Sequence, residues 1–136
     1  MTDFNTQVIE EFRANAGKVG GPFEGAPILL LTTTGARSGH TRTNPMMYRD
    51  GEGGVRYVFA SKAGAPTNPD WYHNLLANPR VTVEVGESTY EATAVPVEGP
   101  ERDRIYAKHA DLYPGFREYQ EKTERVIPVV ALYPVA

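Results

Sequence analysis

The sequence contains no cysteine, which excludes disulfides, a thiolate nucleophile, an iron–sulfur cluster and a thiolate zinc site. It also has no excess of positive charge. Its 14 basic and 17 acidic side chains give a formal net charge of −3 at pH 7, so the chain as a whole does not attract nucleic acid or an anionic membrane. No stretch approaches the roughly 20 apolar residues of a membrane span, and no signal-peptide pattern opens the chain. We therefore expect a cytoplasmic protein without an integral membrane segment, in which any anion site is local.

Several motifs of metal and nucleophilic catalysis are also missing. The three histidines, His40, His73 and His109, show neither H-x-x-x-H nor H-E-x-x-H spacing, so we expect no metal site. No G-x-S-x-G elbow, G-x-G-x-x-G fingerprint or G-K-[ST] loop is present. We assign no catalytic side chain, and we expect a bound cofactor to supply any redox chemistry.

The chain does contain a strong β-strand signal. Its 136 residues suit one domain, and we expect residues 1–136 to form a single unit with a short N-terminal helix. Apolar and β-branched runs predict strands at 28–34, 43–49, 55–60, 81–85, 90–97 and 126–133. Helical spacing predicts helices at 3–17, 68–77, 100–112 and 114–124. The pattern favours a mainly β protein with flanking helices (α+β), built as an antiparallel closed or split barrel, over an alternating βαβ sheet.

Two predicted strand exits carry positive charge. The loop after the first strand holds Arg37 and Arg42 among glycines and hydroxyls, and the exit of the third strand holds Ser61 and Lys62 before a helix. Backbone amides and these cations could together hold a phosphate or carboxylate. We predict that Arg37, Arg42 and Lys62 converge; the alternative is that each is an ordinary solvated cation.

The aromatic residues allow two interpretations. Trp71 and Leu75 lie one turn apart on the helix that Asn68 is predicted to cap. Either both residues form the face of the helix that packs on the core, or Trp71 forms a wall against a planar ligand. Tyr113, Phe116 and Tyr119 recur every three residues, which is typical of a core face and compatible with a pocket.

Three ordered motifs carry a resemblance to a known family. They are Leu31-Thr32-Thr33-Thr34-Gly35-x-x-Ser38-Gly39-x-x-Arg42-x-Asn44-Pro45, Ala60-Ser61-Lys62-x-Gly64 and Pro69-x-Trp71-Tyr72-x-Asn74-Leu75. Together they resemble the deazaflavin-dependent nitroreductase family of actinobacteria, over most of residues 27–134. The resemblance implies a split β-barrel of the kind that binds flavin mononucleotide (FMN), here holding the 8-hydroxy-5-deazaflavin coenzyme F-420.

The resemblance also implies positions for the coenzyme. The phosphate and oligoglutamate tail would contact Ala36, Arg37, Ser38, Arg42, Ser61 and Lys62. The ring would lie along Thr43, Asn44, Pro45, Met46 and Met47, beside Phe59 and Ala60, with Asp70, Trp71, Tyr72 and Asn74 contributed by the helix. The substrate would stack above the ring, near Met47, Tyr113, Phe116 and Tyr119.

The implied reaction is hydride transfer from the reduced deazaflavin to a quinone, an enone lactone or a nitroaromatic. The protein would orient two π systems and stabilise negative charge on the acceptor. Phe116 and Met47 stand where the best-known nitroreductases carry tyrosines. Neither side chain can donate a proton, which disfavours the reduction of nitro-imidazoles. Tyr113, Tyr119 or water would then provide the proton.

Three alternatives stay open. One is an FMN-binding oxidoreductase of the same barrel class, and another is a non-catalytic carrier of the deazaflavin or a related lipid-like ligand. The third is a small barrel that binds single-stranded nucleic acid, which the net charge disfavours. A homodimer and weak membrane association through the N-terminal segment are compatible with the sequence.

Overall fold

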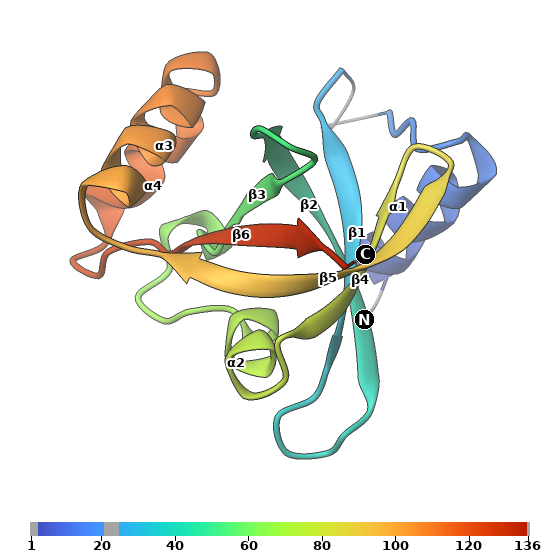
Figure 1. Cartoon of the computed structure of the whole chain (residues 1–136). Coiled ribbons are helices and arrows are strands. Elements are labelled where there is room, and N and C mark those ends of the chain that lie inside the picture. Colours follow the sequence, from blue (N-terminus) through green and yellow to red (C-terminus); the bar gives the residue numbers. More distant parts are fainter. Residues whose placement is uncertain (1–2, 21–24, 136) are drawn as a thin grey trace.

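The computed structural model describes residues 3–20 and 25–135 and shows a closed barrel of six strands in the order β1-β2-β3-β6-β5-β4 (Figure 1). All neighbouring strands pair antiparallel. The strands are β1 (Ile28–Thr34), β2 (Thr41–Asp50), β3 (Arg56–Phe59), β4 (Arg80–Val85), β5 (Ser88–Val97) and β6 (Val129–Pro134). The predicted antiparallel barrel is therefore confirmed.

Strand β1 is the most buried element of the barrel. Leu29, Leu30 and Leu31 are fully buried, and β1 pairs with β2 on one side and with β4 on the other. Leu29 and Leu31 point into the barrel core, whereas Leu30 packs against α1 (Asp3–Ala14). Alternate side chains of a strand face opposite ways, so a continuous apolar run indicates a strand covered on both faces.

Two β-hairpins connect strands that are consecutive in the chain. The first joins β2 to β3, with Asp50 opposite Arg56, and its turn contains Gly53 and Gly54 at φ +66° and +82°. The second joins β4 to β5, with Val85 opposite Ser88. Glycine adopts positive φ without steric cost, which explains the glycine-rich turn of the first hairpin.

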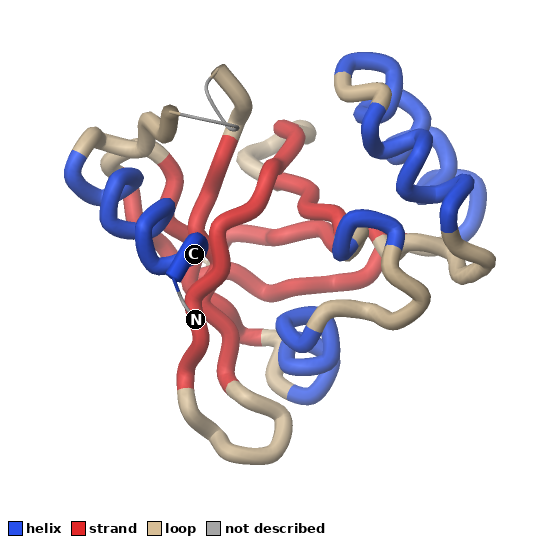
Figure 2. Tube along the Cα trace, turned by 180° about the vertical axis from the view of Figure 1, so that it is seen from behind, coloured by secondary structure: helices blue, strands red, loops and turns tan. Residues whose placement is uncertain are grey.

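Helices surround the strands rather than alternate with them (Figure 2). Besides α1, they are the 3-10 turn η2 (Lys62–Gly64) and the α-helices α2 (Asp70–Ala77), α3 (Gly99–Leu112) and α4 (Gly115–Lys122). Trp71 and Leu75 of α2 belong to the barrel core, which confirms the core interpretation of that helix face.

An outer apolar cluster lies between the barrel and the pair α3–α4. Phe59, Ile127 and Val129 contribute from the barrel side, Ile105 and Tyr106 from α3, and Phe116 and Tyr119 pack against them from α4. Ile105 and Tyr106 are buried in this cluster, and the face of α4 that carries Phe116 and Tyr119 packs on it while staying partly exposed.

Two local predictions are wrong. Helix α2 has Pro69 at its N-cap, and the Asn68 oxygen instead accepts a hydrogen bond from Arg125 Nη1 at 2.7 Å, because a charged donor makes a stronger bond than a backbone amide. Strand β6 begins at Val129 rather than at residue 126. The polar groups of Ile127 bond to side chains of α3 and α4, and Pro128 has no amide to donate to a ladder.

Candidate functional site

A cavity of about 940 Å³ lies between the β1–β2 loop, the start of β2 and the first turns of α2. Its size is within the usual range for a small-molecule site. It is lined by Ile9, Gly35, Ala36, Arg37, Ser38, Thr41, Arg42, Thr43, Asn44, Asp70, Trp71, His73 and Asn74. Twelve of these residues lie within the spans of the first and third sequence motifs, whereas Ile9 comes from α1.

The β1–β2 loop is a tight turn stabilised by its own hydrogen bonds. Gly35 donates its amide to the His40 carbonyl at 2.7 Å, and His40 donates its amide to Ser38 Oγ at 3.1 Å. A Cβ at Gly35 would lie 2.7 Å from Ser38 Oγ, so this close approach requires glycine. Gly39 has φ +75° and donates its amide back to the Gly35 carbonyl. These amides are already paired, so the charge that the loop presents to an anion comes from its arginines.

Asn74 joins this loop to α2. Its side-chain oxygen accepts the amide of Ala36 at 3.0 Å, and its side-chain nitrogen donates to Thr33 Oγ1 at 3.2 Å. Asn74 is only 9% exposed, and its bond to Thr33 is buried, whereas its bond to Ala36 is partly buried. One turn later, Asn78 donates to the Thr34 carbonyl at 3.3 Å. The helix is thereby fixed against the end of β1, and the cavity has a rigid base.

Arg37 and Arg42 bring positive charge to the cavity. Both side chains are exposed, and neither guanidinium makes a hydrogen bond or an ion pair with the described side chains, those of residues 6–20 and 25–135. Asp70 is the acidic residue on the same wall. Two unpaired guanidinium groups beside hydroxyls form a donor set that suits a phosphate or carboxylate.

Lys62 and Ser61 do not line this cavity. Lys62 Nζ donates to Thr67 Oγ1 at 3.1 Å, and the Ser61 carbonyl accepts a bond from Arg125. Their turn packs against α4, where Tyr119 lies beside Gly64. Of the three cations predicted to converge, the cavity therefore brings together Arg37 and Arg42.

The other residues predicted near the ring lie on different faces of the barrel. Thr43 and Asn44 line the cavity with Trp71, whereas Met46, Ala60 and Tyr72 pack with the barrel core. Pro45 lies opposite Leu30 in the β1–β2 ladder, and Phe59 faces the outer cluster. Burial, together with the negative charge of Glu98, raises the pKa of Tyr72.

The four residues predicted around the substrate do not form one group in this chain. Met47 packs in the cluster beneath α1, whereas Phe116 and Tyr119 pack in the outer cluster of α3 and α4. The Tyr113 ring lies 5.0 Å from that of His109, at the edge of the outer cluster.

His109 is a buried polar residue that sequence reasoning missed. It is 1% exposed and stacks on Phe59 with ring centroids 4.1 Å apart and planes 16° apart. Neither ring nitrogen has a hydrogen-bond partner among the described residues. Burial, with a smaller contribution from Arg49, lowers the pKa of His109 to about 4, so the ring is neutral at pH 7. Its place four residues after Ile105 was the signal that it faces inward.

No group of three metal-ligating side chains occurs among the described residues, and no helix there is long and apolar enough to cross a membrane. The groups that the cavity presents to a ligand include guanidinium, hydroxyl and aromatic side chains.

This barrel with flanking helices is the architecture of the split-barrel oxidoreductases. The chain belongs to the F-420H(2)-dependent quinone reductase family, whose model matches residues 5–134. It is thus an oxidoreductase, and the family implies the deazaflavin coenzyme as hydride donor. The resemblance inferred from the three motifs is confirmed at this level.

Individual relatives agree with this assignment. An F-420H(2)-dependent quinone reductase of Mycobacterium tuberculosis is 41% identical over 129 residues, which cover 89% of this chain and 83% of the relative. The solved structure of an F-420-H2 dependent reductase is 44% identical with a TM-score of 0.70, covering 78% of this chain and 93% of that one. A second solved structure, described only as a domain-swapped dimer, is 37% identical with a TM-score of 0.73, covering 93% of this chain and 95% of that one.

The barrel also occurs in more distant proteins. The heme storage protein HutZ of Vibrio cholerae is 17% identical with a TM-score of 0.63, covering 94% of this chain and 88% of that one. At this identity the likeness shows a shared fold alone.

Proposed function

We propose that this protein reduces quinones with hydride from the reduced deazaflavin, and that the cavity beneath the β1–β2 loop binds the anionic part of that coenzyme. The observation that carries the proposal is the pair Arg37 and Arg42, two exposed guanidinium groups without a partner among the described side chains, on the wall of one cavity of about 940 Å³. An acidic protein with a net charge of −3 has no general attraction for an anionic ligand, so a local pair of this kind has functional value.

In this proposal the side chains of the protein bind the coenzyme and orient it. Arg37, Arg42 and the Ser38 hydroxyl bind the phosphate and the acidic tail, and Lys62 binds a further part of the tail beyond the cavity. Thr43, Asn44 and the edge of Trp71 guide the coenzyme along β2. The bound deazaflavin supplies the hydride, and the protein contributes by fixing the distance and angle between two planar molecules.

For the acceptor we propose a quinone first. Relatives 41% identical are named quinone reductases, and a quinone needs no tyrosine hydroxyl at position 116, because its reduced oxygens can be protonated from water. Enone lactones and nitroaromatics are further acceptors to test, with nitro-imidazoles expected to react poorly because Phe116 and Met47 donate no proton.

A coenzyme titration tests the proposal directly. Purified protein is mixed with reduced deazaflavin at micromolar concentration, binding is followed by fluorescence, and oxidation is followed by absorbance with a quinone, an enone lactone and a nitroaromatic. We expect saturable binding and fastest oxidation with the quinone. The Arg37→Ala, Arg42→Ala double variant should lose binding, whereas Arg80→Ala, which removes an exposed arginine paired with Glu91, should not. Absence of binding by the unmodified protein, or tighter binding of FMN, would contradict the proposal.

We also propose that the protein forms a homodimer, because a relative 37% identical is described as a domain-swapped dimer. Light scattering after size-exclusion chromatography would measure the mass, and a mass near 15.0 kDa would contradict this proposal.

A further inference from the structure

The segment 60–68 carries Ser61 and Lys62 in an unusual backbone conformation. Lys62 and Ala63 have φ of +48° and +53°, and Gly64 follows at +80°. Non-glycine residues in this region are strained, and such strain persists only where the surroundings hold the backbone in place. A free loop of this sequence would relax, so something outside the loop must hold Lys62 in its observed position.

The guanidinium of Arg125 provides that restraint. Its Nε donates to the Ala65 carbonyl at 2.8 Å and its Nη2 to the Ser61 carbonyl at 2.8 Å. Its Nη1 donates to the Ala60 carbonyl at 3.2 Å and to Asn68 Oδ1 at 2.7 Å. One side chain thus binds four acceptors on both sides of the strained turn. Four of its five N–H groups are used within the protein, which argues for a structural task rather than ligand contact.

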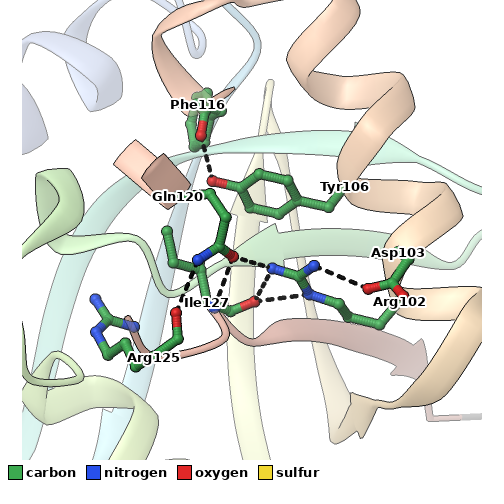
Figure 3. A network of polar contacts seen from close by, with 7 residues as sticks. All are labelled: Arg102, Asp103, Tyr106, Phe116, Gln120, Arg125 and Ile127. Carbon is green, nitrogen blue, oxygen red and sulfur yellow. Dashed lines mark hydrogen bonds and ion pairs between the residues drawn. The ribbon is translucent and has the colours of Figure 1, made fainter. Parts of the chain in front are cut away.

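Arg125 is itself fixed by the outer helices (Figure 3). Its carbonyl accepts the Gln120 side-chain nitrogen of α4 at 2.7 Å, and the Gln120 oxygen accepts the Ile127 amide at 3.0 Å. Arg102 of α3, 8% exposed, donates to the Ile127 carbonyl through Nε at 3.0 Å and Nη2 at 2.8 Å. Residues 125–127 are therefore bonded to side chains of α3 and α4, and the Arg125 side chain in turn restrains the turn at residues 60–68.

We propose that Arg125 is a positioning residue for Lys62, keeping the turn in the strained conformation that presents the ammonium group to the anionic coenzyme. The inference rests on the proposed role of Lys62 in coenzyme binding. A lysine at position 125 would keep the charge but could not reach four divergent acceptors, because an ammonium has three donors on one atom.

The first measurement needs no coenzyme. Amide hydrogen exchange across residues 60–68 should accelerate at least tenfold in Arg125→Lys while exchange in β1 stays unchanged. Asn68→Ala removes one acceptor only and provides a milder variant should Arg125→Lys fold poorly. Arg117→Lys on α4, whose native arginine pairs with exposed Asp111 at 2.7 Å, is the matched control. Unchanged exchange in both Arg125→Lys and Asn68→Ala would overturn the proposal.

The second measurement is a double-mutant cycle on the dissociation constant of the reduced deazaflavin. Arg125→Lys should weaken binding about tenfold in the native background and less than twofold in the Lys62→Ala background, because the two residues act in series. An equal loss in both backgrounds would overturn the inference. If Lys62→Ala binds the coenzyme with full affinity, Lys62 has no role in coenzyme binding, and this inference fails with that role. The hydrogen-exchange data would show separately whether Arg125 restrains the turn.

Discussion

The amide of Ala36 donates a 3.0 Å hydrogen bond to the side-chain oxygen of Asn74, which joins two residues 38 positions apart. The same Asn74 side chain donates to Thr33. This contact makes the orientation of the arginine-bearing loop depend on the position of α2, and it links the first sequence motif to the third.

Replacing Asn74 by alanine should therefore affect both folding and binding. We expect Asn74→Ala to lower the free energy of unfolding by about 2 kcal/mol, because the buried Thr33 hydroxyl and the partly buried Ala36 amide both lose their partner. We also expect the coenzyme to bind about tenfold more weakly, because the loop is no longer held. Urea unfolding and coenzyme titration measure the two effects. Asn78→Ala, one turn later, should cost stability but leave affinity intact, and equal affinity losses in the two variants would contradict the role given to Asn74.

Removing single cations should weaken coenzyme binding. We expect Arg37→Ala, Arg42→Ala and Lys62→Ala each to cost about 1 to 3 kcal/mol of binding free energy, the range for a charge-assisted contact. The losses should shrink at high salt, since the groups are exposed. Titrations at two salt concentrations measure this, with Arg80→Ala as the control. Unchanged affinity in all three variants would remove the basis of the anion site.

Stability should depend on pH through His109. The native pKa is about 4 and the unfolded pKa about 6.5, so the unfolded chain binds the proton first as the pH falls. Stability is therefore lost as the pH falls from about 6.5 toward 4, by about 2 kcal/mol at pH 5. His109→Phe keeps the stacking on Phe59 and removes this loss. We expect the stability difference between the variant and the native protein to grow by about 2 kcal/mol between pH 7.5 and pH 5 in urea unfolding.

The control for this experiment is Ile105→Val, which alters the same outer cluster without removing a titratable group. Its stability difference from the native protein should stay the same across this pH range. A parallel pH dependence of the native protein and His109→Phe would contradict the buried, neutral state of His109.

Gly64 tests the contact between the η2 turn and α4. A Cβ at Gly64 would lie 2.9 Å from the Tyr119 carbonyl oxygen, and the residue has φ +80°. Gly53 has φ +66° with nothing within 4 Å of the added atom. Both alanine variants carry a conformational cost of about 1 kcal/mol, so we expect Gly64→Ala to be less stable than Gly53→Ala by at least a further ~1 kcal/mol. Equal stabilities in thermal unfolding would show that the turn can move away from α4.

The strands and the family were accessible from the sequence because their signals are local. The apolar run of β1 and the glycines between β2 and β3 report on burial and turn geometry within a few residues. The three motifs identify the family because they occur in a set order along the chain. The spacing of Trp71 and Leu75, one helical turn apart, indicates a shared helix face, and the structure places that face in the core.

Other features depended on contacts between distant segments. No local pattern shows that Arg125 would bind the carbonyls of residues 60, 61 and 65, that Asn68 would accept its bond instead of capping α2, or that Met47 and Phe116 would pack in separate clusters. The sequence alone thus determined the barrel, its family and the positive charge of its loops. The tertiary structure decided which charges share a cavity and which restrain the backbone, because closing the barrel fixes the distances between side chains that are far apart along the chain.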